Sequence, residues 1–296
     1  MRIVMAAVRS ILSALLALAL VLPAAAADRS GPVHGLWVWK SSSVLQEPSA
    51  VETLDQFCRS SAITEIYISV PSQYSALEGL NLAQLITQLH ASGVRVEALL
   101  SSTNADEPGA ARTKLLDHVQ SILQFNRQHP AQRFDGVHLD IEPQQRPENK
   151  GPGNLEFLPG LVQAYRAVRV LTDRAGLTLN ADIQNKLLKG DLEQRRLLLS
   201  SVPRLTLMLY ELSAADDGAS AAEKKDKLLQ SSANFLKLAY QDLPGPDLAR
   251  MAIALRTPDY GALLPQMLAA LDAANVGNPH YLGWARHSYN DVLKGQ

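Results

Sequence analysis

The chain has 296 residues, a formal net charge of −1 and 47% apolar residues. The near balance of acidic and basic residues excludes the strongly basic surface of many nucleic-acid-binding proteins, so we expect no nucleic acid partner. The length exceeds that of an ordinary domain, but a single (β/α)8 barrel commonly has this size.

The first residues have the pattern of a secretory signal peptide. Arg2 and Arg9 give the start of the chain a positive charge, and an apolar run over residues 11–22 follows. Pro23 ends this run, and the alanines at 24–27 are the small residues that signal peptidase requires. Removal of this segment takes away two arginines, so the mature chain is expected to be mildly acidic.

Cleavage is expected near Ala26 or Ala27, which divides the chain into a signal peptide at 1–27 and a mature barrel at 28–296. The apolar run is too short to span a bilayer and no second run follows it, so we expect no membrane contact after cleavage. An uncleaved anchor is the alternative. Cys58 is the single cysteine, so no intrachain disulfide can form. We expect a periplasmic or secreted protein, and export with one thiol fits the periplasm better than a disulfide-stapled extracellular scaffold.

Strands and helices are predicted to alternate from there to the end of the chain. Short apolar strands are expected near 34–39, 63–70, 94–100, 134–142, 177–183, 204–211, 250–256 and 280–284. Amphipathic helices are expected near 49–61, 80–92, 109–128, 155–175, 190–200, 219–241 and 259–275, with a last one after 285. This order predicts a closed parallel (β/α)8 barrel (a TIM barrel) or an open doubly wound sheet, and the count of eight favours the barrel. No interdomain linker is evident, so we expect one domain.

The fourth strand carries the most informative pattern. Side chains alternate between the two faces of a strand, and here one face is apolar while the other is ionisable: His138, Asp140 and Glu142. Pro143 cannot join a sheet ladder and ends the strand just past Glu142. The acids therefore lie at the carboxyl end of the strand, where barrel enzymes carry their active sites.

Asp140 and Glu142 are the candidate catalytic pair. Their Cα atoms are expected to lie about 6.6 Å apart, from a rise of about 3.3 Å per residue, so their side chains can approach closely. Two neighbouring carboxylates do not ionise freely together, so one pKa rises, and a general acid needs such a rise.

These residues have a family resemblance. The stretch from Asp135 to Glu142 resembles the Asp-Gly-x-Asp-x-Asp-x-Glu signature of family 18 glycoside hydrolases, the chitinases and related endo-N-acetylglucosaminidases, with His138 in place of the middle Asp. Residues 207–211 are similar to that family's Met-x-Tyr-Asp, with Glu211 in place of Asp. Trp284 is similar to the final-strand Trp on which the family's sugar rests. Together, these motifs extend the resemblance over the mature chain, in divergent form.

The resemblance implies roles for four of these residues. Glu142 would be the general acid that protonates the glycosidic oxygen. Asp140 would orient the 2-acetamido group of the substrate, which itself attacks the anomeric carbon, and Tyr210 would hold the acetamide carbonyl. Trp284 would stack under the sugar ring.

Other inward-facing residues are candidates for substrate binding. Two pairs of residues each share one face of a strand: Asn180 with Asp182, and Met208 with Tyr210. Four single residues lie near strand ends or beside the motifs: Trp39, His138, Glu211 and Arg256. We expect His138 to pair with Asp140 as a cation and so to lower the pKa of Asp140. That arrangement would suit a substrate without an acetamido group, or would mark the loss of the family's mechanism.

Two further functions stay open. The first is a non-catalytic glycan-binding barrel, in which the acidic strand is only a paired network. The second is a metal-dependent barrel hydrolase with His138, Asp140 and Glu142 as ligands, although no second ligand group has suitable spacing. We expect a carbohydrate partner and no cofactor, whereas the sugar, the linkage, the stereochemical outcome and the oligomeric state are open.

Overall fold

The computed structural model describes residues 31–72, 75–151, 153–210, 218–245 and 247–294. Residues 31–296 belong to one compact unit. The predicted signal peptide at 1–27 and the candidate residue Glu211 lie outside the described residues. Within the described residues, no helix has both the length and the apolar character that crossing a bilayer demands.

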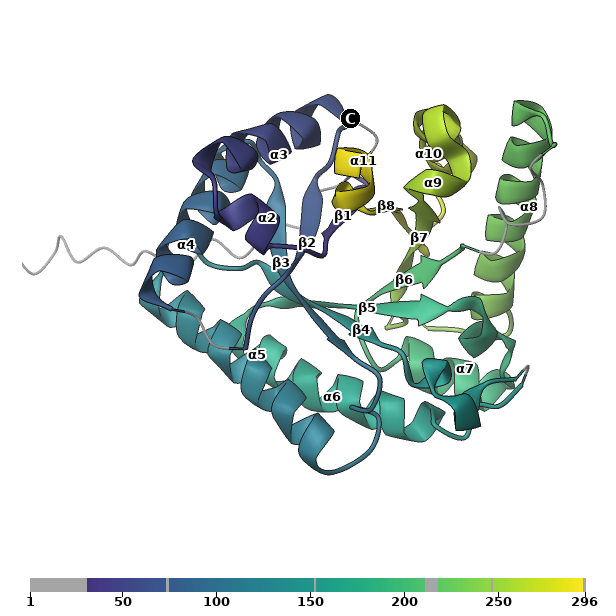
Figure 1. Ribbon diagram of the computed structural model, residues 1–296. Helices are drawn as coiled ribbons and strands as arrows, with labels where there is room; N and C mark the ends of the chain where they lie inside the picture. The colour runs from purple at the N-terminus through teal and green to yellow at the C-terminus, as the bar shows by residue number, and fades with distance from the viewer. Residues whose placement is uncertain (1–30, 73–74, 152, 211–217, 246, 295–296) are drawn as a thin grey trace, which may run out of the picture. The chain divides into compact units, whose positions relative to one another are not determined.

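Eight parallel strands form a closed barrel in which each strand pairs with the next and β8 pairs with β1 (Figure 1). The strands are β1 (Val33–Val38), β2 (Glu65–Ser69), β3 (Arg95–Ser102), β4 (Gly136–Ile141), β5 (Thr178–Gln184), β6 (Arg204–Met208), β7 (Arg250–Arg256) and β8 (Tyr281–His287). The predicted (β/α)8 barrel is therefore confirmed, and the open doubly wound sheet is wrong because the ring closes.

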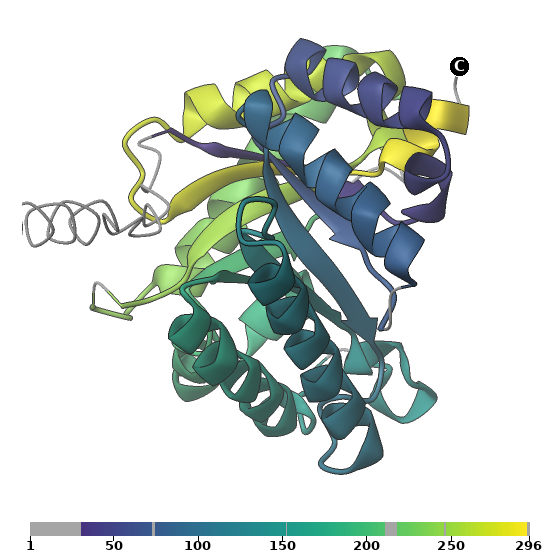
Figure 2. The ribbon, with the colours of Figure 1, turned by 90° about the vertical axis from the view of Figure 1, so that its left-hand side faces the viewer.

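Helices cover the outside of the barrel (Figure 2). They are α2 (Ser42–Leu45), α3 (Pro48–Ser60), α4 (Ala76–Ala91), α5 (Ala110–Gln128), α6 (Leu158–Ala175), α7 (Leu192–Leu199), α8 (Ala221–Tyr240), α9 (Thr257–Tyr260), α10 (Leu264–Ala274) and α11 (Tyr289–Lys294). Short 3-10 turns are η1 (Pro143–Gln145), η2 (Pro147–Asn149), η3 (Asn185–Lys189) and η4 (Gly261–Leu263).

Local sequence explains where several helices begin and end. The Ser75 side chain accepts a hydrogen bond from the backbone of Glu78, whose carboxylate accepts one from the backbone of Ser75, and this capping box begins α4. The same reciprocal arrangement begins α7 and α8. Gly176 adopts a left-handed conformation (φ 64°) that ends α6 and turns the chain into β5.

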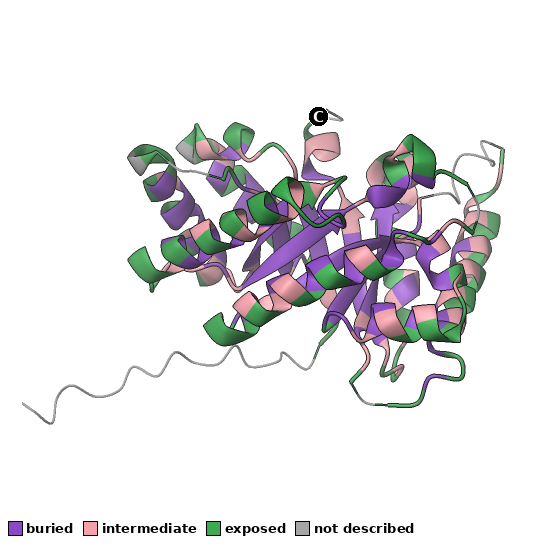
Figure 3. Cartoon of the chain, turned by 90° about the horizontal axis from the view of Figure 1, so that it is seen from below, coloured by how far each residue is buried: buried purple, intermediate pink, exposed green. Residues whose placement is uncertain are grey.

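The apolar core lies between the strands and the helices, so the strands are almost wholly buried while the outer faces of the helices are exposed (Figure 3). The interior of the barrel is different in character. Its amino-terminal part holds Arg204, which contacts Glu65 at 2.7 Å and Glu97 at 3.1 Å. Buried charges are tolerated when they are paired and hydrogen-bonded, as these are.

Candidate active site

A cavity of about 210 Å³ opens at the carboxyl ends of the strands. Aromatic, carboxyl and amide side chains form its wall, together with one thioether and one imidazole: Trp37, Trp39, Asp140, Glu142, Gln145, Asp182, Gln184, Met208, Tyr210 and His287. Six of the candidates from the sequence are therefore brought together here: Trp39, Asp140, Glu142, Asp182, Met208 and Tyr210. No Lys or Arg is among these residues.

Glu142 follows β4 directly, and its backbone N–H donates to the carbonyl of Ser102 across from β3. Its half-buried carboxyl group accepts hydrogen bonds from Gln184 at 3.1 Å and from Gln144 at 3.2 Å, and Gln145 contacts the other oxygen. Burial raises the pKa of Glu142, the amide hydrogen bonds oppose that rise, and the nearby charge of Asp182 adds to it.

Asp140 lies one inward-facing position before Glu142 and is 8% exposed. Its Oδ1 atom is buried and accepts no hydrogen bond from the described residues. Burial raises the pKa of Asp140 to about 8, with further contributions from the charges of Asp182 and Glu142. Asp140 therefore keeps its proton in most protein molecules at neutral pH.

His138 does not form the expected ion pair with Asp140. Its Nε2 atom lies 2.8 Å from Asp182 Oδ1, its Nδ1 atom lies 3.4 Å from Glu97 Oε2, and its ring lies 3.8 Å from the ring of Tyr67. Burial alone would lower the pKa of His138, but the two carboxylates outweigh burial and raise it to about 9. His138 is fully buried beneath the cavity.

The strand register explains this outcome. Leu99 of β3 and Asn180 of β5 flank His138 in the sheet. Glu97 on β3 therefore lies one inward-facing position below His138, and Asp182 on β5 lies one inward-facing position above it. The imidazole reaches both, while Asp140 is held apart from it along the same strand. His138 still lowers the pKa of Asp140, as expected, but burial and the charges of Asp182 and Glu142 outweigh this effect and the pKa rises.

Asp182 has both carboxylate oxygens engaged. Oδ1 faces His138, and Oδ2 accepts a hydrogen bond from the indole nitrogen of Trp37 at 3.2 Å. The backbone carbonyl of Asp182 accepts a bond from the Tyr165 hydroxyl at 3.3 Å. Asp182 thus joins the floor of the cavity to the buried network below.

Three other candidates lie away from the cavity. Asn180 is buried below it and accepts a hydrogen bond from Thr206 at 3.2 Å. Arg256 is exposed at the end of β7, 3.9 Å from Asp259. Trp284 is buried, stacks on His34 with ring centroids 4.1 Å apart, and donates to Asp272 at 3.0 Å. This position does not agree with the expected role of Trp284 as a sugar platform.

His287 is a cavity residue that the sequence reasoning missed. Its Nε2 atom accepts a hydrogen bond from the indole nitrogen of Trp39 at 2.9 Å, and its ring lies 5.5 Å from that of Tyr210. Burial lowers the pKa of His287, which agrees with a neutral ring that accepts at Nε2. Side chains three positions apart on a strand lie on opposite faces, so the expectation that Trp284 faces inward placed His287 on the outer face.

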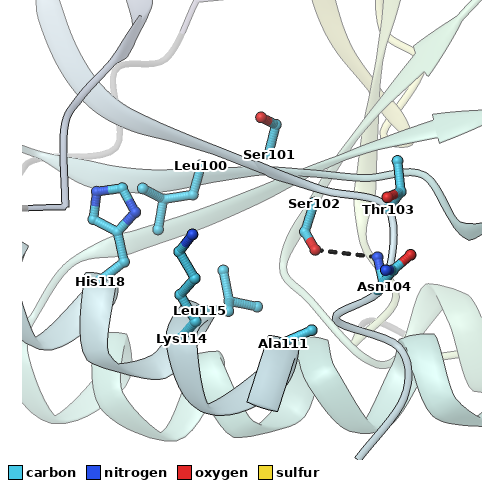
Figure 4. A pocket seen from close by; sticks show the side chains of 9 residues that line it. All are labelled: Leu100, Ser101, Ser102, Thr103, Asn104, Ala111, Lys114, Leu115 and His118. Carbon is cyan, nitrogen blue, oxygen red and sulfur yellow. Dashed lines mark hydrogen bonds between the residues drawn. The ribbon is translucent and has the colours of Figure 1, made fainter. Parts of the chain in front are cut away.

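A second cavity of about 310 Å³ lies between the end of β3 and α5 (Figure 4). Six polar and three aliphatic residues line it: Leu100, Ser101, Ser102, Thr103, Asn104, Ala111, Lys114, Leu115 and His118. It contains no carboxyl group. The chemistry of acid catalysis is therefore available only in the smaller of these two cavities.

A metal site is not apparent in the described part of the chain, which contains no group of three or more His, Cys, Asp and Glu side chains placed to hold an ion. Both ring nitrogens of His138 already face carboxylates. The arrangement expected for a metal-dependent hydrolase at His138, Asp140 and Glu142 is not formed.

No protein family model and no curated protein matches the sequence. Solved structures do match. A chitinase from Bacteroides thetaiotaomicron has a TM-score of 0.56 at 12% identity, over 90% of this chain and 93% of that one. A GH18 chitinase from Pseudoalteromonas aurantia has a TM-score of 0.55 at 13% identity, over 89% and 96%. The PgaB glycoside hydrolase domain from Bordetella bronchiseptica has a TM-score of 0.50 at 11% identity, over 89% and 96%. The chain therefore has the fold of these glycoside hydrolases and a divergent sequence.

Proposed function

We propose that this protein is an exported glycoside hydrolase that cleaves a glycosidic bond in a polysaccharide or glycan. One observation carries the proposal: Asp140 and Glu142 line a cavity at the carboxyl end of β4, and the pKa of each is raised. A carboxyl group that keeps its proton near neutral pH is what a general acid requires. The likeness of the fold to chitinases and the strand-four motif support the same activity.

Glu142 is the proton donor in this proposal. Its proton passes to the glycosidic oxygen as the bond between that oxygen and the anomeric carbon breaks, and the bonding electrons leave with the oxygen as an alcohol. The 2-acetamido oxygen of the substrate forms a bond to the anomeric carbon in the same step, oriented by Asp140 and Tyr210. Water then opens this intermediate and returns a proton to Glu142.

The cavity wall supports a sugar as the ligand. Trp39, Tyr210 and His287 offer ring faces on which the apolar side of a pyranose can rest. Because carboxyl groups line the cavity and no Lys or Arg does, we propose an uncharged or N-acetylated glycan as the substrate in preference to a polymer of acidic sugars.

The test is release of reducing ends from a panel of polysaccharides with and without N-acetyl groups. The mature protein is compared with Glu142→Gln, and with Glu156→Gln as a control for the same change at an exposed glutamate. We expect turnover of N-acetylated substrates by the wild type and the control, and none by Glu142→Gln, which should still bind. Turnover confined to sugars without the acetamide would keep the hydrolase and remove the acetamido mechanism. Glycan binding without turnover by the wild type would identify a non-catalytic binding barrel.

We also propose that residues 1–27 direct export and are then removed. Amino-terminal sequencing of the protein recovered from the periplasm or the medium tests this. A mature start near residue 27 or 28 is expected, and recovery of the intact chain from the membrane would identify an uncleaved anchor.

A further inference from the structure

Charged side chains form a connected column inside the barrel, beneath the cavity. Arg204 contacts Glu65 at 2.7 Å and Glu97 at 3.1 Å, and Arg95 approaches Glu65 at 3.6 Å. The column continues upward from Glu97 to His138 and from His138 to Asp182. It therefore links the amino-terminal end of the barrel to the floor of the candidate active site.

The charges of this column balance without Asp140. Arg95, Arg204 and a doubly protonated His138 supply three positive charges, which match the three carboxylates of Glu65, Glu97 and Asp182. Burial raises the pKa of Glu65, but both of its oxygens accept from Arg204, at 2.7 and 3.0 Å, which is the geometry of an ionised carboxylate. Arg204 and His138 also hold the pKa of Glu97 at about 2 against the opposing effect of burial. An ionised Asp140 would add a buried negative charge without a partner, which is unfavourable in a protein interior.

Hydrogen bonding gives the same assignment. The His138 ring donates from Nε2 to Asp182 at 2.8 Å, and its Nδ1 atom lies 3.4 Å from Glu97 Oε2, within ion-pair distance but without a hydrogen bond. A carboxylate beside each nitrogen favours the cationic ring. Asp182 accepts from His138 and from Trp37, so both of its oxygens act as acceptors and the carboxyl group is ionised. Asp182 is thus the carboxylate that accepts the hydrogen bond from His138. Among the described residues, no cation lies within ion-pair distance of Asp140.

We propose that His138 is a positioning residue that fixes Asp182 as an anion at the floor of the cavity, so that Asp140 meets the substrate as a protonated carboxyl that donates a hydrogen bond. The role of the protonated Asp140 in catalysis rests on the proposed glycosidase function. The protonation states of His138, Asp182 and Asp140 do not depend on that function. In this arrangement the strand-four histidine does not replace a carboxylate partner of Asp140. It supports a carboxylate on β5 that keeps the proton of Asp140 in place.

The groups that act on Asp140 come from several elements. Asp182 of β5 and Glu142 raise its pKa, while His138 opposes them weakly from below. The phenols of Tyr210, after β6, and Tyr165, on α6, interact with Asp140 electrostatically and stay protonated because burial raises the pKa of each. Among these charges Asp182 has the largest effect on the pKa of Asp140, and it can be removed without altering the proposed acid itself.

The matched control is Asp272. Its Oδ2 atom lies 2.8 Å from His34 Nε2 and accepts from the indole of Trp284 at 3.0 Å, which parallels the contacts of Asp182 with a histidine and a tryptophan. Asp272 lies on α10 and outside the cavity. Asp182→Asn and Asp272→Asn therefore each remove a carboxylate that contacts one histidine and one tryptophan, from a buried site and from a partly exposed site respectively.

The first test uses side-chain NMR of protein with labelled histidine and aspartate, without any substrate. We expect His138 to keep both ring protons through neutral pH and the Asp140 carboxyl to titrate above neutrality. In Asp182→Asn, the Asp140 titration should move down by at least about one pH unit, whereas Asp272→Asn should leave it in place. A neutral His138 at pH 7, or an Asp140 titration that does not respond to Asp182→Asn, would overturn the proposal.

The second test is the pH profile of kcat/KM on the best glycan substrate. Loss of activity at alkaline pH should move to lower pH in Asp182→Asn by the same amount as the NMR titration, and Asp272→Asn should keep the wild-type profile. If Asp182→Asn turns over substrate with an unshifted profile, the proposal fails while the glycosidase stands. If no glycan is cleaved at all, the glycosidase fails and the NMR titration still decides the role of His138.

Discussion

Both ends of the barrel interior contain buried carboxyl groups, but these groups have different partners at the two ends. At the amino-terminal end, Glu65 and Glu97 contact the Arg204 guanidinium. At the carboxyl end, Asp140 and Glu142 have no cation within ion-pair distance among the described residues. Arg204 and His138 lower the pKa of Glu97 despite its burial, whereas burial and neighbouring carboxylates raise the pKa of Asp140. The comparison teaches that the partner of a buried carboxyl group, more than its depth, decides whether it is part of the framework or available for proton transfer.

Loss of the acid at the open end should have the largest effect. Glu142→Gln keeps the size of the side chain and its contacts with Gln184, but it has no proton to donate. We expect kcat to fall by about 10²–10⁴-fold, with little change in the free energy of unfolding. Steady-state kinetics and urea unfolding of the same preparations measure both. Activity within tenfold of the wild type would mean that another group donates the proton.

Breaking the paired end should act on stability instead. Arg204→Met leaves Glu65 and Glu97 buried without their guanidinium, and we expect the free energy of unfolding to drop by about 3–5 kcal/mol. Arg196→Met removes an exposed arginine 3.9 Å from Glu193 and should change stability by less than about 0.5 kcal/mol. Urea unfolding measures both variants. Equal losses of unfolding free energy would show that the buried ion pairs of Arg204 contribute no more to stability than the exposed pair of Arg196.

The protonated end should make stability depend on pH. The pKa of Asp140 is about 8 in the folded protein and about 3.9 in an unfolded chain, so the folded state binds the proton more tightly. Its contribution is complete below about pH 4 and is lost as the pH rises towards 8, by about 1.4 kcal/mol per pH unit. His138, with a folded pKa of about 9, adds a further loss only above about pH 6.5.

Asp140→Asn should remove the Asp140 part of this dependence. Between pH 4.5 and 6.5, the wild type should lose on the order of 3 kcal/mol relative to the variant, measured by urea unfolding at each pH. Parallel stability curves for the two proteins over this range would contradict the assignment of the proton to Asp140.

The smallest effects concern two tryptophans, Trp39 and Trp284. Trp39→Phe removes the indole donor to His287, and Trp284→Phe removes the indole donor to Asp272. Each should cost about 1 kcal/mol of folding stability. Only Trp39→Phe should weaken glycan binding, because only Trp39 lines the cavity. Calorimetric titration with a glycan oligomer on the Glu142→Gln background separates the two; weaker binding in Trp284→Phe would restore Trp284 as a sugar platform.

The fold could be predicted from the sequence because it depends on local patterns. Alternating apolar residues marked the strands, and their count of eight indicated the barrel. Asp140, Glu142 and Tyr210 reached one cavity as expected, since the carboxyl ends of parallel strands meet at one face. These parts of the prediction needed no knowledge of which residue faces which across strands.

The partner of His138 could not be predicted in this way. Glu97 and Asp182 are 41 and 44 positions from His138 in the sequence, and the register of three strands in a closed ring decides that they meet it. The facing of β8 could not be read from its sequence either. Trp284 was expected to face inward, and alternation along the strand then places His287 outward, so one error of facing affected both residues.

The ion pairs at the amino-terminal end also join the two halves of the barrel. Glu65 and Glu97 come from β2 and β3, whereas Arg204 comes from β6. A cut between β4 and β5 would place the acids in one fragment and their counter-ion in the other, each inside a half-ring that cannot close. The same contacts that keep the interior neutral should therefore make each half insoluble when it is expressed alone. The two halves should assemble when they are co-expressed, so folding of the barrel depends on both halves together.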